Sequence, residues 1–237
     1  MTSSLVIGAS RGLGRGFVEQ LLAREGQVLA TVRREEDAEV LHALAEAAEA
    51  GDRLETFFCD VADPESRAGL AAALEGRAIH TLIHNAGVYG PRAPQLGELP
   101  EADWQQVLHI DTVAPVLTAE ALLPQLRAAA QQGGPVKLAF LTSLMGSIAD
   151  NGSGGSYLYR SAKAGLNAAA RSLSIDLAPD GISVLLLHPG WVQTDMGGSS
   201  APLQIEESVA GMLARIEALR PADSGSFVDW SGKSLPW

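Results

Sequence analysis

The chain has 237 residues, of which 46% are hydrophobic and 19% are charged, and its net charge is −11. This length suits one α/β domain with a large core, and the acidic charge argues against nucleic acid or an anionic membrane surface as a partner. A single cysteine excludes an intrachain disulfide, five histidines without ligand spacing predict no metal site, and the lack of a leader or long apolar run favours a cytoplasmic protein.

The first expected element is a short buried strand at residues 5–7, followed by a glycine-rich turn at 8–14 and a helix. Strand, glycine-rich turn and helix together bring backbone N–H groups and a helix N-terminus up to a pyrophosphate. The spacing is G-x-x-x-G-x-G rather than G-x-G-x-x-G, and such a segment can also be only a turn. We favour phosphate binding, with the contacts expected from Gly8, Ser10, Arg11, Gly12, Leu13 and Gly14.

The second expected strand, residues 28–32, ends in Arg33 and Arg34. An acidic residue at this position binds the ribose hydroxyls of NAD, whereas a basic residue accommodates the 2′-phosphate of NADP. The alternative is a pair of solvated arginines at a helix start, where the helix dipole disfavours positive charge. We therefore expect NADP, with Arg11 of the glycine-rich turn directed to the same region.

The rest of the chain continues to alternate between helices and strands, without repeats or a domain boundary. This alternation predicts an α/β fold over residues 1–237: one doubly wound, Rossmann-type domain with a seven-stranded, mostly parallel sheet and helices on both faces. Loops are expected at 88–100 and at the Gly/Ser-rich connection 146–156. The expected helices are 35–50, one starting with Asp63 as N-cap, 101–131, 156–177 and 208–219, and the expected strands are 54–58, 79–84, 136–141, 182–187 and 225–228.

Tyr159 and Lys163 lie early in one of these helices, four residues apart and therefore on one helical face. An ammonium beside a phenol favours the phenolate, and a phenol tuned in this way can act as a general acid or base. Alone, this spacing is more often surface packing. The surrounding motifs decide whether the pair is a catalytic acid/base pair or only surface packing.

The order of these motifs resembles the short-chain dehydrogenase/reductase superfamily along nearly the whole chain. Each motif is weak alone, but their order and the element that carries each one argue against coincidence. The segment before Tyr159 and residues 229–237 further resemble the C-factor-like or sniffer-like carbonyl reductases. The matching residues are Gly8, Gly12, Gly14, Asp60, Asn85, Ala86, Gly87, Ser143, Tyr159, Lys163, Pro189, Gly190 and Thr194.

The resemblance implies a role for each catalytic residue. Tyr159 would donate a proton to a carbonyl oxygen as hydride arrives from the nicotinamide, or accept one in the reverse direction. Lys163 would depress the pKa of Tyr159 and hold the nicotinamide ribose. Ser143 would stabilise the charge on the carbonyl oxygen; Ser147 and Ser156 are nearby competitors, but Ser143 ends a strand.

The resemblance also implies contacts to the cofactor, in three places along the chain. Asp60 would meet the adenine, Asn85 would lie along the cofactor, and Thr194 would meet the carboxamide. The same site is expected to include Val61, Ala86, Gly87, Pro189, Gly190 and Val192, together with Tyr159 and Lys163.

One position departs from the family pattern. Seven residues after Trp104 the family usually has an asparagine, which helps a water relay protons to the lysine, and this chain has Asp111. Near Lys163, an ionised carboxylate offsets part of the field that activates Tyr159. We expect reduction to persist with the acid limb of the pH profile moved; the alternative is that Asp111 is a tolerated substitute.

Two functions follow from these observations. The first is an NADPH-dependent reductase of ketones or aldehydes, acting reversibly on small carbonyl and alcohol substrates. The short connection between Thr194 and Glu206 suggests an open, partly apolar site. The second is a cofactor-binding signalling protein of the C-factor type with vestigial catalysis. Family members commonly form homodimers or homotetramers through helices corresponding to 101–131 and 156–178, and we expect the same possibilities here.

Overall fold

The computed structural model describes residues 2–91 and 96–237. Its centre is a seven-stranded sheet with the order β3-β2-β1-β4-β5-β6-β7, and each neighbouring pair is parallel. The sheet confirms the predicted fold, and its named strands are parallel throughout rather than mostly so. The strands are β1 (Ser3–Ile7), β2 (Gln27–Val32), β3 (Leu54–Phe58), β4 (Thr81–His84), β5 (Val136–Leu141), β6 (Ile182–His188) and β7 (Ser226–Asp229).

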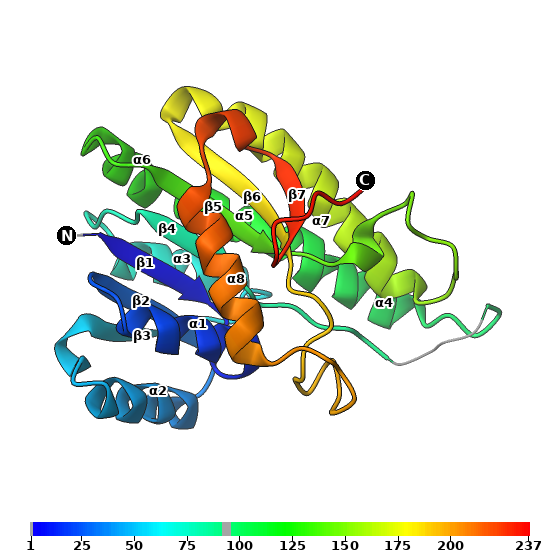
Figure 1. Cartoon of the computed structure of the whole chain (residues 1–237), viewed down its shortest axis with the longest axis horizontal. Helices are drawn as coiled ribbons and strands as arrows, with labels where there is room; N and C mark the ends of the chain where they lie inside the picture. The colour runs from blue at the N-terminus through cyan, green and yellow to red at the C-terminus, as the bar shows by residue number, and fades with distance from the viewer. Residues whose placement is uncertain (1, 92–95) are drawn as a thin grey trace.

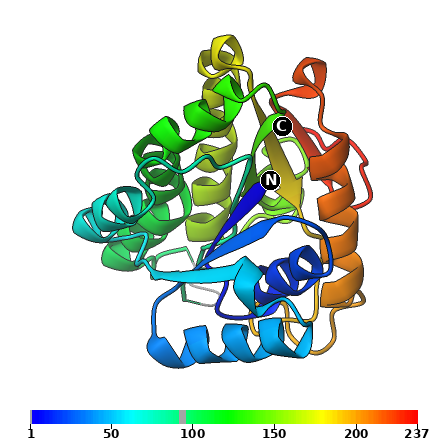
Figure 2. The same ribbon diagram turned by 90° about the vertical axis from the view of Figure 1, so that its left-hand side faces the viewer.

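Helices cover both faces of this sheet (Figures 1 and 2). Helices α1, α2 and α8 lie on one face, and α3 to α7 lie on the other, as the edge-on view of Figure 2 shows. The α-helices are α1 (Gly12–Leu22), α2 (Glu35–Ala47), α3 (Pro64–Ala73), α4 (Glu101–Leu108), α5 (Ala114–Ala121), α6 (Leu123–Gln131), α7 (Tyr157–Asp176) and α8 (Ile205–Ala218). Short 3₁₀ turns occupy η1 (Gly51–Arg53), η3 (Leu144–Gly146), η4 (Ala178–Asp180) and η5 (Pro221–Asp223), and η2 (His109–Val113) is a π-helical turn.

Each face of the sheet has its own apolar core. Alternate strand residues point to opposite faces, so Ile7 and Phe140 pack under α3, α5, α6 and α7, whereas Val6 and Ala139 pack under α1, α2 and α8. These strand residues are fully buried. The strand order turns back between β1 and β4, and a ligand crevice is expected at the carboxyl ends of the strands there.

The predicted single helix at 101–131 is wrong. The chain bends by 49° between the segments Glu101–Ala121 and Leu123–Gln131, and Pro124 is the second residue of the new helix. The first segment also contains η2, so its turns are not uniform. Within the described residues no single helix is long and apolar enough to span a membrane, although this bent pair passes a test of length and composition alone.

Smaller boundaries also differ from the predictions. Asp63 caps α3 as expected, since its Oδ1 accepts the Glu65 N–H at 3.0 Å. Helix α8 begins at Ile205 rather than at 208, and α2 ends at Ala47 rather than at 50. The predicted loop at 88–100 contains residues 92–95, which lie outside the described part of the chain.

Candidate active site

A cleft of about 760 Å³ opens at the carboxyl ends of the central strands. The glycine-rich turn and the ends of β2 and β3 form one part of its wall, and α7 forms another. The expected site residues that line it are Gly8, Ser10, Arg11, Gly12, Leu13, Arg33, Asp60, Val61, Asn85, Ala86, Gly87, Asp111, Tyr159, Lys163, Pro189 and Thr194. Gly14, Arg34, Ser143, Gly190 and Val192 do not line it.

The glycine-rich turn is held tightly by its neighbours. The Gly8 N–H donates to Thr31 Oγ1 at 2.9 Å, and Asn85 Nδ2 donates to the Gly8 carbonyl oxygen at 2.7 Å. A Cβ at Gly14 would collide with that same carbonyl oxygen, so a side chain at Gly14 would force the turn open. Helix α1 has no side-chain cap and no acidic residue in its first turn, which suits an anionic phosphate group.

The two arginines after β2 point to different partners. Arg33 lines the cleft and has no carboxylate within ion-pair distance among residues 2–91 and 96–237. Arg34 instead donates two hydrogen bonds to Asp37, at 3.1 and 3.2 Å. The hydrogen bond from Arg34 lowers the pKa of the Asp37 carboxyl. The structure therefore brings Arg33, but not Arg34, into the cleft.

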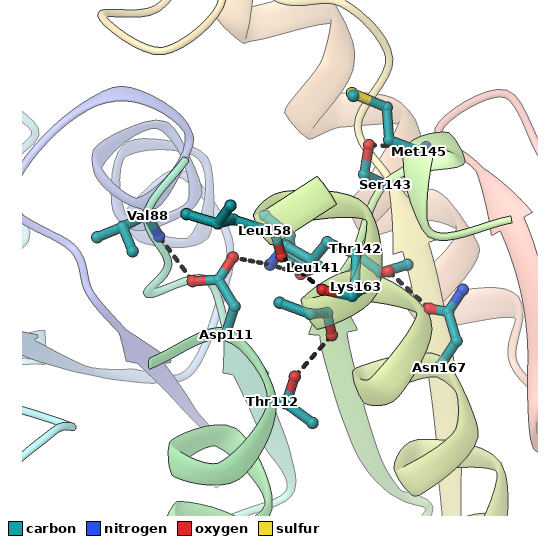
Figure 3. A network of polar contacts seen from close by, with 12 residues as sticks. Val88, Asp111, Thr112, Leu141, Thr142, Ser143, Met145, Leu158, Lys163 and Asn167 are labelled. Atoms are coloured by element: carbon teal, nitrogen blue, oxygen red, sulfur yellow. Dashed lines mark hydrogen bonds and ion pairs between the residues drawn. The ribbon is translucent and has the colours of Figure 1, made fainter. Parts of the chain in front are cut away.

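Tyr159 and Lys163 come from the first two turns of α7 and are both buried. The Lys163 ammonium lies 5.6 Å from the centre of the Tyr159 ring. It donates to the Leu141 carbonyl oxygen at 3.3 Å and lies 3.2 Å from Asp111 Oδ2, as Figure 3 shows. The cation is thus fixed between the end of β5 and the π-helical turn.

Asp111 is held in place from several sides. It sits in η2, where the widened turn directs its side chain toward α7, and it is 0% exposed. Its Oδ1 accepts the Val88 N–H at 2.7 Å (Figure 3). Gly87 leaves room for this arrangement, since a Cβ there would stand 3.2 Å from Asp111 Oδ1 and 3.3 Å from Lys163 Nζ.

The pKa of the Tyr159 phenol lies above its ordinary value. Burial raises this pKa most, the Lys163 ammonium lowers it, and Asp111 raises it further. Lys163 lowers the pKa of Tyr159, as expected, but burial and Asp111 together raise this pKa by more. Burial alone lowers the pKa of Lys163, yet Asp111 and Tyr159 raise it more, so Lys163 stays a cation.

Ser143 follows β5 and lies beside Tyr159, although it does not line the cleft. Its side chain is close enough to the Tyr159 hydroxyl to lower the pKa of that phenol, and its Oγ accepts the Met145 N–H at 3.1 Å. The competing serines are engaged elsewhere: Ser147 Oγ accepts the Asp150 N–H at 3.0 Å, and Ser156 Oγ lies 2.9 Å from Tyr89 Oη. This placement favours Ser143 over both competitors, while its catalytic role stays a prediction.

Several polar residues around the cleft were not predicted. Thr31 is a polar residue inside an apolar strand, a signal that it bonds to the backbone of the neighbouring turn. Thr142 donates to Asn167 Oδ1 at 2.6 Å, and Asn167 lies one helical turn beyond Lys163 on the same buried face. Tyr89 and Ser156 meet only in three dimensions, so no pattern in the sequence indicates their contact.

Two histidines, the buried His84 and the half-buried His188, end strands near the site. Burial lowers the pKa of His84 to about 3 and that of His188 to about 4, and nearby Lys163 lowers the pKa of His84 further. Both are therefore neutral at pH 7 and poor proton donors. In the described part of the chain, no group of three His, Cys, Asp or Glu residues could hold a metal ion.

The fold and cleft define a class of protein: a dinucleotide-binding α/β domain with a buried tyrosine and lysine at the end of its crevice. The sequence model of the short chain dehydrogenase family matches residues 3–204, and the chain belongs to this family.

Known proteins resemble the chain over most or all of its length. C-signal of Myxococcus xanthus is 47% identical over 159 residues, which cover 67% of this chain and 93% of C-signal. The solved carbonyl reductase Sniffer of D. melanogaster is 35% identical, with a TM-score of 0.93 and full coverage of both chains. The NADPH-bound carbonyl reductase from chicken fatty liver is 37% identical, with a TM-score of 0.92 and coverage of 100% and 99%. The predicted likeness to C-factor-like and sniffer-like proteins is confirmed.

Proposed function

We propose that the protein is an NADPH-dependent reductase that converts a ketone or aldehyde to an alcohol, with Tyr159 as the acid. The observation that carries this proposal is the buried Tyr159 phenol at the cleft, which has the Lys163 ammonium 5.6 Å from its ring centre and Ser143 close enough to lower its pKa. The similarity to solved carbonyl reductases, one of them NADPH-bound, supports the same reaction class.

The raised pKa of Tyr159 fits this direction of reaction. Its phenol is protonated at pH 7, and reduction requires a proton for the carbonyl oxygen. Ser143 can donate a second hydrogen bond to that oxygen and stabilise its developing charge. Lys163 supplies positive charge that favours the phenolate left after proton transfer. Asp111 acts through Lys163 as a positioning residue.

The residues of the cleft fit an NADP cofactor. The uncapped start of α1 and the glycine-rich turn would hold the pyrophosphate, and Arg33 would hold the 2′-phosphate. Asp60, Asn85 and Thr194 lie along the same cleft. When bound, the nicotinamide supplies the hydride.

The substrate is proposed to be small to medium in size and partly apolar. Met196 lines the cleft and is 44% exposed, and Trp191 of the same segment is 56% exposed. Such a mouth accommodates several apolar carbonyl compounds rather than one charged substrate.

The proposal is tested by NADPH oxidation with a panel of aldehydes and ketones, using Tyr159→Phe as the control. We expect turnover with several substrates and a loss of about 10²- to 10⁴-fold in the variant. Equal, near-zero turnover in both proteins, together with tight NADPH binding, would contradict the reductase.

That outcome would favour the second candidate, a cofactor-binding signalling protein. The 47% identity to C-signal supports this alternative, as does the aspartate at the usual asparagine position. Against it stands the buried Tyr159, Lys163 and Ser143 cluster, because a binding protein needs no positioned phenol.

A further inference from the structure

We infer that Tyr89 is a positioning residue that fixes the Tyr159 phenol by joining the loop after β4 to the start of α7. The inference rests on the proposed function, because it concerns how the acid of that reaction is held. Neither the family motifs nor the cofactor contacts include Tyr89, which is two residues beyond the Asn85-Ala86-Gly87 motif.

The first observation is the ring contact. The centroids of the Tyr89 and Tyr159 rings lie 4.7 Å apart with an interplanar angle of 30°. This separation is within the range of favourable offset aromatic pairs. Tyr159 is only 8% exposed, so the neighbouring ring is part of what keeps water from the phenol. Tyr89 also raises the pKa of Tyr159, although less than burial does.

The second observation is the hydroxyl contact. Tyr89 Oη lies 2.9 Å from Ser156 Oγ, a hydrogen bond between segments that are 67 residues apart in sequence. Ser156 is the N-cap of α7, three residues before Tyr159, and its side chain makes no cap hydrogen bond. The hydroxyl of Ser156 therefore hydrogen-bonds the loop after β4 and does not cap its own helix.

The backbone at Ser156 explains why such a tie is needed. Its φ is +46°, a left-handed conformation that costs a non-glycine residue energy, and Gly154 and Gly155 precede it with φ of +65° and +67°. These left-handed residues set the direction in which the chain enters α7, and the buried Leu158 together with a tertiary contact at Ser156 holds the first turn. The Tyr89 hydroxyl provides that contact one turn from the acid.

The same loop also holds the other end of the charge network. Val88, next to Tyr89, donates its N–H to Asp111, which pairs with Lys163. Two consecutive residues therefore set the positions of both the cation and the phenol. A shift in this loop therefore displaces the Tyr159 phenol and the Lys163 cation together. If α7 alone held the two side chains, a movement of the loop would leave both in place.

The test compares Tyr89→Phe, which keeps the ring, with Ser156→Ala, their double variant and the control Tyr157→Phe. The Tyr157 hydroxyl makes no hydrogen bond within residues 2–91 and 96–237.

We expect Tyr89→Phe and Ser156→Ala each to lower kcat about 3- to 10-fold, with no further loss in the double variant. The Kd for NADPH and the activity of Tyr157→Phe should stay unchanged. Wild-type kcat in Tyr89→Phe, or losses that multiply, would overturn the inference.

A second measurement needs no turnover and keeps the inference separate from the proposed function. The chain has three tyrosines, so Tyr89→Phe/Tyr157→Phe leaves Tyr159 as the only phenol to titrate by phenolate absorbance. Tyr89→Ala/Tyr157→Phe should titrate at lower pH, because the ring that shields Tyr159 is gone. Equal titrations would refute the inference even in an active enzyme. A shift in a protein without turnover would support it while the reductase proposal fails.

Discussion

The two ends of the cleft contain the same kind of interaction in opposite environments. At the end near the glycine-rich turn, Arg11 and Asp195 pair at 3.0 Å with both side chains 75% exposed. At the other end, Lys163 and Asp111 pair at 3.2 Å with exposures of 6% and 0%. Exposed pairs contribute little to stability because water and salt screen them, whereas a buried charge that loses its partner is costly.

This difference separates two tasks. The exposed end can change partners at low cost, which suits a site that must exchange an anionic cofactor. The buried end cannot, and its two charges adjust in opposite directions the pKa of Tyr159, which burial raises most. We therefore expect substitutions at the buried end to alter folding and pH dependence, and substitutions at the exposed end to alter binding.

The largest effect is expected for Lys163→Met. It leaves Asp111 as an uncompensated buried carboxylate, and we expect a loss of about 3–5 kcal/mol in the free energy of unfolding. Denaturant unfolding measures this loss. The double variant Lys163→Met/Asp111→Asn removes both charges and should recover much of the stability, with activity still lost. If Lys163→Met is as stable as the wild type, loss of the Lys163 charge leaves no costly buried carboxylate at Asp111.

Asp111→Asn should move the pH profile. Asp111 raises the pKa of Tyr159, so removing its charge lowers that pKa. Carbonyl reduction needs the protonated phenol, and its alkaline limb should move to lower pH. Alcohol oxidation needs the phenolate, and its acid limb should move the same way. For reduction, the raised pKa of Tyr159 places the expected shift on the alkaline limb rather than on the acid limb expected from the sequence. Profiles identical to wild type in both directions would leave Asp111 as a tolerated substitute.

The two arginines that follow β2, Arg33 and Arg34, should differ in their effect on cofactor choice. Arg33→Ala removes a guanidinium that lines the cleft, and we expect the Kd for NADPH to rise about tenfold or more with little change for NADH. Arg34→Ala breaks a pair with Asp37 and should change the Kd about twofold at most. Titration of cofactor fluorescence gives both constants. If the double variant Arg33→Ala/Arg34→Ala weakens the binding of NADPH and NADH equally, the 2′-phosphate assignment is wrong.

The smallest effect is expected for Arg11→Ala. Its pair with Asp195 is largely exposed, so the free energy of unfolding should fall by about 1 kcal/mol or less. The difference should shrink further at high salt, since exposed charges are screened. Urea unfolding at two ionic strengths measures this. A loss as large as that of Lys163→Met would erase the contrast between the two ends.

The parts of the fold that follow from local pattern were predictable. The glycine-rich turn, the parallel sheet and the N-cap at Asp63 depend on neighbouring residues and on a repeated alternation of strands and helices. The break in the predicted helix at 101–131 has a local signal in Pro124, but apolar residues on both sides continue the helical period. Because the helical period continues across Pro124, the sequence pattern predicts one helix and does not indicate the bend.

The site was predictable in its members but less so in its electrostatics. Spacing along α7 places Tyr159 and Lys163 on one face, but it does not report how deeply the phenol is buried, and burial decides the direction of its pKa. The sequence likewise cannot tell that Arg34 turns to Asp37 while Arg33 stays in the cleft. Contacts between distant segments, such as Tyr89 with Ser156, require the tertiary structure.

The π-helical turn at His109–Val113 has a consequence for how this site can change. A π-helical turn closes over one residue more than an α-helical turn, so it holds one surplus residue in the backbone. Deleting a residue there would restore a regular helix and rotate one flank by roughly 100° relative to the other. The carboxylate of Asp111 would then leave its cation. The charge partner of Lys163 thus depends on chain length as well as on side-chain identity, and substitution libraries alone do not sample that variable.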